Sequence, residues 1–172
     1  MAALGYWCSA MSEAKSAVLA AAEREARALD HQETIAVVRL AGESYGMTAS
    51  QVAEIVRPQE IVEVPNAPEH VEGVINLRGR IIPVVDLRRH LGMPDAGVTA
   101  ETRIVITEIH SKAGATETVG LIVDGVQEVR TIGEGQIDDK VAGTASVSDE
   151  YLRGVVNLDA GLIILLDIDK AF

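Results

Sequence analysis

Short apolar runs, separated by glycine, proline, asparagine and aspartate, follow one another from residue 34 almost to the end of the chain. Examples are TIAVVRL (34–40), MTASQVAEIV (47–56) and GLIILLDI (161–168). Runs of this length, rich in β-branched residues and closed by turn-forming residues, are typical of strands. The pattern predicts a mostly β-structure, in which AGESYG (41–46) is a hairpin connection.

Residues 12–30 have a different pattern, because SEAKSAVLAAAEREARALD consists mainly of strong helix formers. Ser12 is suited to the N-cap position, and Glu13 falls in the first turn. We therefore expect a partly helical N-terminal extension over residues 1–33. Its rough apolar stripe favours packing on the domain, and a free partner-binding helix is the alternative.

A repeat occurs within the strand-rich part of the chain. GVINLRGRIIPVVDL (73–87) aligns with GVVNLDAGLIILLDI (154–168) at a constant offset of 81, with six of fifteen positions identical. A weaker match relates residues 46–57 to residues 120–131 at an offset of 74. The order is preserved, so we interpret residues 34–172 as one domain made of two duplicated β-units, at about 34–95 and 102–170.

The duplicated units point to two small barrels. Each unit offers four to six short strands, and a closed barrel removes the exposed sheet edges that invite aggregation. Apolar residues make up 48% of the chain and aromatic residues 3%, so the core must be aliphatic.

Composition excludes several classes of function. A formal net charge of −11 without a basic cluster argues against binding to nucleic acid or to an anionic membrane surface. No apolar run reaches the roughly 20 residues of a membrane-spanning helix. The single cysteine rules out an internal disulfide, and we expect a cytoplasmic protein without membrane insertion.

The sequence does not predict an enzyme. His31, His70, His90 and His110 are isolated from one another, without the spacing of a metal site, and we interpret each as a surface or cap residue. Asp86 and Asp167 end the two copies of the repeat, where a carboxylate can accept hydrogen bonds from the following turn. We therefore expect neither catalytic residues nor a metal or cofactor.

The two copies of the repeat differ at one place that suggests a site. Arg78-Gly79-Arg80 in the first copy corresponds to Asp159-Ala160-Gly161 in the second, so the turn itself does not require arginine. We predict that Arg78 forms a partly exposed ion pair with Glu54, beside Val52 on the same face of a strand. It is either an ordinary surface pair or an orienting pair at the rim of a binding groove.

The chain closely resembles the CheW family of chemotaxis coupling proteins. The resemblance is carried by GVINLRGRIIPVVDLR, by YGMTASQVAEIV before it, and by GLIVDGVQEV and EYLRGVVNL after it. The resemblance covers residues 34–170. It implies an all-β fold of two interlocked five-stranded SH3-like barrels. It also implies a non-enzymatic adaptor between transmembrane chemoreceptors and the histidine kinase CheA, located in the cytoplasm at receptor arrays.

The resemblance also implies a receptor-binding site. In that family the cytoplasmic tip of a methyl-accepting chemoreceptor binds in a groove between the barrels, at positions that match Val52, Glu54, Gly73 and Arg78, and we add Asn76 of the same motif. Gly73 would let a partner helix approach the backbone. The alternative is that Gly73 serves only local backbone geometry, because Gly154 occupies the same place in the second copy.

The family further contacts the regulatory domain of CheA through barrel ends and builds rings partly through a loop that matches residues 133–150. Better-known members carry a basic and an aromatic residue where this chain has Asp138 and Gly143, so we do not carry the ring contact over. Two other readings are a CheW-like regulatory module of a different two-component kinase pathway and an unrelated ligand-binding β-barrel.

Overall fold

The computed structural model describes residues 32–94, 97–110, 114–138, 149–158 and 161–172. The predicted N-terminal helix over residues 12–30 and Gly143 therefore lie outside the described residues.

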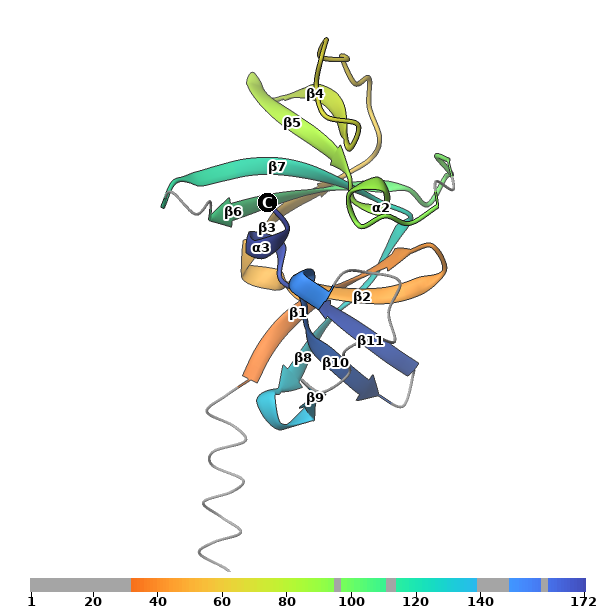
Figure 1. Cartoon of the computed structure of the whole chain (residues 1–172), viewed down its shortest axis with the longest axis vertical. Coiled ribbons are helices and arrows are strands. Elements are labelled where there is room, and N and C mark those ends of the chain that lie inside the picture. Colours follow the sequence, from red (N-terminus) through yellow and green to blue (C-terminus); the bar gives the residue numbers. More distant parts are fainter. Residues whose placement is uncertain (1–31, 95–96, 111–113, 139–148, 159–160) are drawn as a thin grey trace, which may run out of the picture.

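Eleven strands in the described part of the chain form two sheets, shown in the lower and upper halves of Figure 1. The first sheet, in spatial order, contains β8 (Gly125–Gly133), β1 (Gln32–Leu40), β2 (Glu43–Thr48), β11 (Gly161–Leu166), β10 (Leu152–Leu158) and β9 (Ile137–Asp138). The second contains β3 (Val52–Val56), β6 (Arg103–His110), β7 (Thr116–Val123), β5 (Arg80–Asp86) and β4 (Val71–Leu77). Short helical segments are α2 (Leu87–His90), α3 (Ile168–Ala171), η1 (Ala49–Gln51), η2 (Glu134–Gln136) and η3 (Asp149–Tyr151).

The two sheets form two SH3-like barrels, which confirms the predicted fold class. We name the sheet that contains β1 barrel A and the sheet that contains β3 barrel B. Barrel B has five strands, and barrel A has five strands and the two-residue β9.

The barrels are interlocked by the path of the chain. The chain passes from β1 and β2 in barrel A to β3 through β7 in barrel B, and it returns to barrel A for β8 through β11. Each predicted unit thus contributes strands to both barrels, and the C-terminus lies between them (Figure 1).

The repeated sequence occupies matching places in the two barrels. In barrel A, Gly46 of β2 pairs with Leu165 of β11, and in barrel B, Gly120 of β7 pairs with Val84 of β5. These four residues are related by the offsets of 74 and 81. Both β4 and β10 also carry a register shift next to the repeated glycine. The boundaries of the units at 34–95 and 102–170 remain a prediction.

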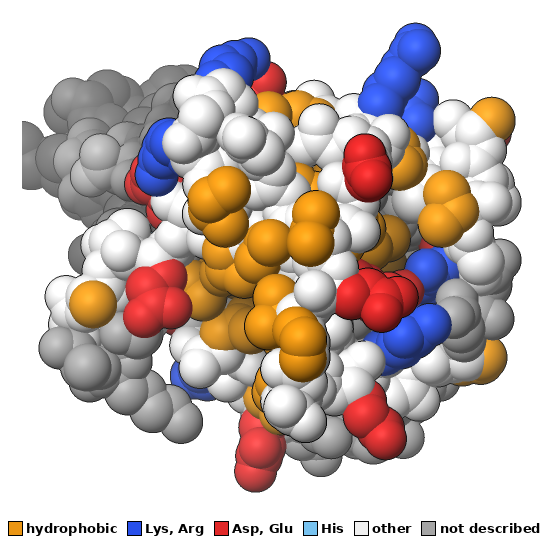
Figure 2. Space-filling model, turned by 90° about the horizontal axis from the view of Figure 1, so that it is seen from above, with side chains coloured by type: hydrophobic (Ala, Val, Ile, Leu, Met, Phe, Trp, Pro, Cys, Tyr) orange, Lys and Arg blue, Asp and Glu red, His pale blue; other side chains and the backbone are white. Residues whose placement is uncertain are grey.

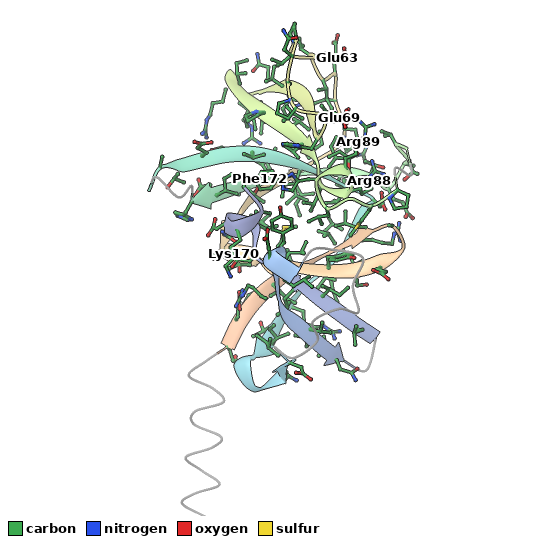
Figure 3. The ribbon with its side chains drawn as sticks, viewed as in Figure 1. Glu63, Glu69, Arg88, Arg89, Lys170 and Phe172 are labelled. Atoms are coloured by element: carbon green, nitrogen blue, oxygen red, sulfur yellow. The ribbon has the colours of Figure 1, made fainter. Side chains whose placement is uncertain are left out.

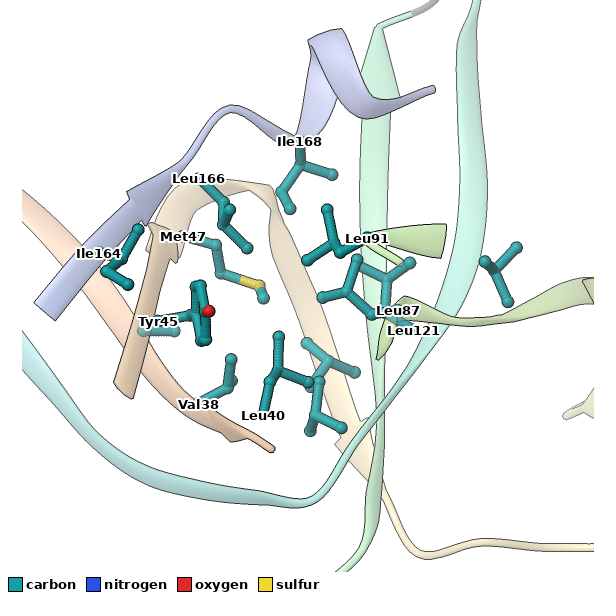
Figure 4. Packing of buried hydrophobic residues seen from close by; sticks show 14 of the residues in the cluster. Val38, Leu40, Tyr45, Met47, Leu87, Leu91, Leu121, Ile164, Leu166 and Ile168 are labelled. Carbon is teal, nitrogen blue, oxygen red and sulfur yellow. The ribbon is translucent and has the colours of Figure 1, made fainter. Parts of the chain in front are cut away.

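Mostly aliphatic side chains form three buried clusters among the described residues. One six-residue cluster lies in barrel A around Ile163, and another lies in barrel B around Ile82. The third and largest cluster takes residues from both barrels (Figure 4), including Leu40, Met47 and Leu166 from barrel A, Leu121 from barrel B and Leu87 of α2, which follows β5. Because this shared core is buried only when the barrels are together, they form one folding unit.

The first hairpin is tighter than AGESYG suggests. Leu40 pairs with Glu43, so the connection consists of Ala41 and Gly42, both with positive φ (50° and 89°). Two such residues are typical of a type I′ turn. The last four residues of AGESYG belong to β2, and the side chain of Tyr45 among them is fully buried in the core.

Candidate functional site

The turn between β4 and β5 presents Arg78 to solvent. Leu77 pairs with Arg80, and the two residues between them have positive φ, 54° for Arg78 and 83° for Gly79. Asn76 shapes this turn, because its Oδ1 accepts a hydrogen bond from the backbone N–H of Gly79 at 2.8 Å. A left-handed conformation costs a residue with a Cβ about 1 kcal/mol, so the turn gains nothing from arginine. The presence of arginine at position 78 is therefore explained by the contacts of its side chain and not by the turn.

Arg78 pairs with Glu54 as predicted. Its Nη2 donates to Oε1 of Glu54 at 2.6 Å, and the two side chains are 76% and 30% exposed. Glu54 lies on β3, whereas Arg78 follows β4, and these two strands are the edges of the barrel B sheet. The predicted ion pair is therefore confirmed, and it joins two edges of the barrel while most of the guanidinium faces solvent.

The second arginine of the turn also reaches across the barrel. Nη2 of Arg80 donates to Oγ1 of Thr118 on β7 at 3.2 Å, and Arg80 is exposed. The turn thus places two guanidinium groups over the outer surface of barrel B.

Val52 does not share a face with Glu54, and that part of the prediction is wrong. A register shift between the two residues pairs Val52 with Thr107 and Glu54 with Ile106. Adjacent residues of a strand point to opposite faces, so the extra residue in this bulge turns Val52 away from Glu54. Val52 packs against the shared core instead.

Gly73 is not open to a partner helix. It is buried, with φ of 146°, and a Cβ at this position would lie 2.2 Å from the carbonyl oxygen of Val62. Val62 and Val74 form a β-bridge with two backbone hydrogen bonds of 2.9 Å. The close approach that Gly73 permits is therefore made by the chain itself, so the partner-helix rationale is wrong and local geometry explains the glycine.

Exposed apolar residues accompany the ion pair on barrel B. Ile55 of β3, Ile81 of β5 and Val62 and Val64 before β4 are 40–65% exposed. Figure 2 looks onto the end of the molecule where β4 and β5 lie and shows hydrophobic side chains gathered at its centre, with acidic and basic groups around them. Apolar area surrounded by charge is typical of protein interaction sites.

Both repeated aspartates act as helix caps, which confirms their structural interpretation. Oδ1 of Asp86 accepts from the backbone N–H of Arg88 at 2.9 Å, and Oδ1 of Asp167 accepts from that of Lys170 at 3.2 Å. They begin α2 and α3 respectively.

Sequence reasoning missed Arg88, which is 2% exposed. Its guanidinium binds Asp86 through Nε (3.0 Å) and Nη2 (2.6 Å) and binds Asp124 through Nη1 (2.8 Å). Oδ2 of Asp124 in turn accepts from the backbone N–H of Ala41 in barrel A at 2.7 Å. Figure 3 labels Arg88 and its neighbour Arg89 near α2. This network lies where the chain crosses from barrel B to barrel A.

His90 is not a simple surface or cap residue. Its ring stacks on Phe172 with a centroid distance of 4.4 Å, and the ring of His70 meets it edge-on at 4.8 Å. Its Nε2 lies 2.5 Å from the carbonyl oxygen of Ala171. Burial lowers the pKa of His90, against the opposing effect of the Ala171 hydrogen bond, and the charge of His70 lowers it further. The cluster connects α2 with the C-terminal helix α3.

The described residues contain no group of three or more histidine, cysteine, aspartate or glutamate side chains placed to hold a metal ion. None of the helices in that part of the chain has the length and hydropathy of a membrane span. The exposed arginines, their acidic partner Glu54 and the exposed apolar residues of barrel B suit binding to another protein.

Comparison with known proteins agrees on one family. The sequence model of the CheW-like domain matches residues 34–172. The chain is 33% identical to the chemotaxis protein CheW of Bacillus subtilis over 135 residues, which cover 78% of this chain and 83% of the relative. It is 40% identical to that of Thermotoga maritima over 119 residues, covering 67% and 72%. The crystal structure of the scaffolding protein TtCheW from Thermoanaerobacter tengcongensis matches with a TM-score of 0.71 at 35% identity, covering 81% of this chain and 87% of that chain.

Proposed function

The chain belongs to the CheW family and is a chemotaxis scaffold protein, and from this premise we propose that it joins chemoreceptors to a CheA-type histidine kinase without catalysing a reaction itself. Its partners are the cytoplasmic tip of a methyl-accepting chemoreceptor and the regulatory domain of the kinase. The protein then works in the cytoplasm at receptor arrays.

The receptor site in this proposal is centred on the Glu54–Arg78 pair. The observation that carries it is Arg78, a 76% exposed side chain held on a left-handed turn residue where arginine has no conformational advantage. Ile55, which follows Glu54 in β3, and Ile81, which follows Arg80 in β5, add exposed apolar area to the same barrel. Arginine next to apolar area is frequent among the residues that dominate binding energy.

Asn76, Gly73 and Val52 have indirect roles in the proposed site. Asn76 holds the turn that presents Arg78, and Gly73 allows the segment with Val62 to pack beside β4. Val52 anchors β3 in the shared core and so fixes the strand that carries Glu54. Substitutions at these three positions would weaken receptor binding indirectly, because they would displace Glu54 or Arg78.

The test is calorimetric titration of a purified receptor tip into the protein. Arg78→Glu should weaken binding about tenfold, about 1.4 kcal/mol, because it removes the exposed guanidinium and places two carboxylates together. Adding Glu54→Arg restores the pair in reversed order and should recover part of the affinity. An exposed ion pair contributes at most about 1 kcal/mol to folding stability, so both Arg78→Glu and the double variant should stay folded.

Arg80→Glu is the matched control, because Arg80 lies in the same turn but reaches Thr118 rather than Glu54. It should change receptor affinity less than Arg78→Glu does. Normal receptor binding by Arg78→Glu, with the fold intact, would remove the pair from the proposed site.

A further inference from the structure

The short helices α2 and α3 meet where the two copies of the repeat come together. The offset of 81 relates them, and each begins at one of the two capping aspartates. Helix α2 follows β5 of barrel B, whereas α3 follows β11 of barrel A. His90 at the end of α2 corresponds to Ala171 at the end of α3, and Nε2 of His90 lies 2.5 Å from the carbonyl oxygen of Ala171. Equivalent ends of the two copies are thus joined across the barrels.

The half-buried ring of His90 contacts rings from both barrels. His70 before β4 meets it edge-on at 4.8 Å, Tyr151 before β10 lies tilted at 5.8 Å, and Phe172 stacks on it at 4.4 Å. His70 and Tyr151 are again counterparts at the offset of 81, and their backbone carbonyl oxygens accept from the N–H groups of the two capping aspartates at 3.0 and 2.8 Å. The imidazole pair therefore belongs to barrel B, and the two other rings belong to barrel A.

Contacts at both of its ends hold α3 across the barrels. Ile168 is 1% exposed in the shared core. Oδ1 of Asp169 accepts from Nε2 of Gln51 at 2.9 Å and from the backbone N–H of His110 at 2.8 Å. The end of the helix contacts His90. A helix of four residues is too short to be stable alone, so α3 stays formed only while these contacts persist.

Protonation of His90 puts a charge into this cluster. A carbonyl oxygen can only accept a hydrogen bond, so Nε2 carries the hydrogen, and the neutral ring has a bare Nδ1 that takes up the proton. The charge then lies in edge contact with His70, which can also be protonated. Burial has the largest effect and lowers the pKa of His90, the hydrogen bond to Ala171 opposes it, and the charge of His70 lowers it further. The docked helix therefore disfavours the charged ring.

The acidic and basic side chains on the elements around His90 have other partners or are exposed. They pair as Arg88 with Asp86 and Asp124, Arg89 with Glu72, Lys170 with Asp167, and Asp169 with Gln51, whereas Glu69 and Glu150 are exposed. Figure 3 labels Glu69, Arg88, Arg89 and Lys170 among them. Among the described residues, the titratable groups in ring contact with His90 are His70 and Tyr151, and neither is a carboxylate.

We propose that α3 holds the two barrels together in a pH-dependent way, and that protonation of His90 beside His70 releases it. When α3 leaves, its end no longer covers His90, so the imidazole is hydrated and accepts a proton more readily. A form that binds protons more readily is favoured as pH falls. The contribution of His90 to docking is therefore complete above about pH 6.5, the value for a free histidine, and is lost as pH falls below it. Release also separates Asp169 from Gln51, which precedes β3.

The test is amide hydrogen exchange of the full-length protein, measured by NMR between about pH 7.5 and about pH 5.5, where histidines titrate and most carboxylates stay charged. Two amides report on α3: the N–H of Ala171 donates to the carbonyl oxygen of Asp167 at 3.2 Å, and that of His110 donates to Asp169. Their protection should be more than about tenfold lower than that of Leu121 in the central strand of barrel B, because local opening costs less than global unfolding. It should fall further as pH decreases, after correction for the intrinsic exchange rate.

Three glutamine variants identify the groups responsible. His90→Gln keeps an amide donor for the Ala171 carbonyl but cannot titrate, so the loss of protection with pH should disappear. His70→Gln should move the titration midpoint of the His90 ring signals upward, toward about 6.5, and reduce the loss. His110→Gln is the matched control: His110 contacts the same helix, with Nδ1 3.6 Å from Asp169, and is 62% exposed, so the loss at Ala171 should remain.

Equal protection of Ala171 and Leu121, a protection that does not change with pH, or a loss that persists in His90→Gln would each overturn the proposal. Disappearance of the loss in His110→Gln would assign it to that histidine and overturn the proposal as well. If His90→Gln leaves α3 unprotected at every pH, His70→Gln decides, because it keeps the contact of His90 with Ala171, and an unchanged loss in that variant overturns the proposal. The measurements need neither receptor nor kinase, so their outcome is independent of the proposed function.

Discussion

Replacement of Arg88 by methionine should destabilise the protein strongly while leaving the outer surface unchanged. The guanidinium is 2% exposed and binds Asp86 twice, Asp124 once and the carbonyl oxygen of Gly97 at 3.0 Å. Methionine has a similar length but provides no donor, so the carboxylate of Asp86, which is 3% exposed, loses its cation while it stays buried.

The expected loss follows from that geometry. Removing one partner of a buried ion pair costs about 3–5 kcal/mol, because the other charge remains desolvated without compensation. Total stability is about 5–15 kcal/mol for a domain, so the loss is a large fraction of it. For a chain of this size it corresponds to a decrease in Tm of about 10 °C.

The assay is equilibrium unfolding in urea, followed by circular dichroism. Arg88→Met should lower the urea midpoint with an unchanged slope, since the surface exposed on unfolding is the same. Arg89→Met is the matched control on the same helix, because Arg89 pairs with Glu72 at 2.7 Å with 44% and 27% of the side chains exposed. That control should lose less than about 1 kcal/mol. An Arg88→Met variant within about 1 kcal/mol of the unchanged protein would refute a structural role for the network.

Two further substitutions test particular contacts. Gly73→Ala should lower the free energy of unfolding in urea by more than about 2 kcal/mol, because the new Cβ would overlap the carbonyl oxygen of Val62. Gly79→Ala is the control: it has open space around the Cβ and should cost only about 1 kcal/mol, because of its positive φ. Equal losses in the two variants would contradict the overlap at Gly73. His90→Gln should flatten the pH dependence of stability. The lowered pKa of His90 means that the unfolded chain takes up a proton more readily, so stability falls as pH decreases below about 6.5. An unchanged slope between about pH 7.5 and about 5.5 in thermal unfolding would exclude His90 as its source.

The repeat predicted two small barrels because it is carried by short hairpins, whereas the interlocked SH3-like arrangement was implied by the resemblance to the CheW family. β4–β5 and β10–β11 keep one offset, since a two-residue turn leaves no room for insertions. The Glu54–Arg78 pair was predictable for a related reason. Only one of the two copies of the turn has the arginine, so the turn does not require it and its side chain is expected to have another role.

The features that were missed depend on contacts between distant segments. The bulge that separates Val52 from Glu54 has no marker in the local sequence, and the carbonyl oxygen above Gly73 comes from a segment with little regular structure. Charged side chains usually lie on the protein surface, so the sequence alone did not predict that Arg88 is buried.

The most direct test of the coupling role is recovery of the kinase regulatory domain on an immobilised receptor tip, with and without this protein. The unchanged protein should bring the kinase domain to the tip. Arg78→Glu should reduce that recovery about tenfold, as expected from a loss of about 1.4 kcal/mol, while its direct affinity for the kinase domain stays the same. Recovery that does not depend on the protein, or that is unaffected by Arg78→Glu, would contradict the account.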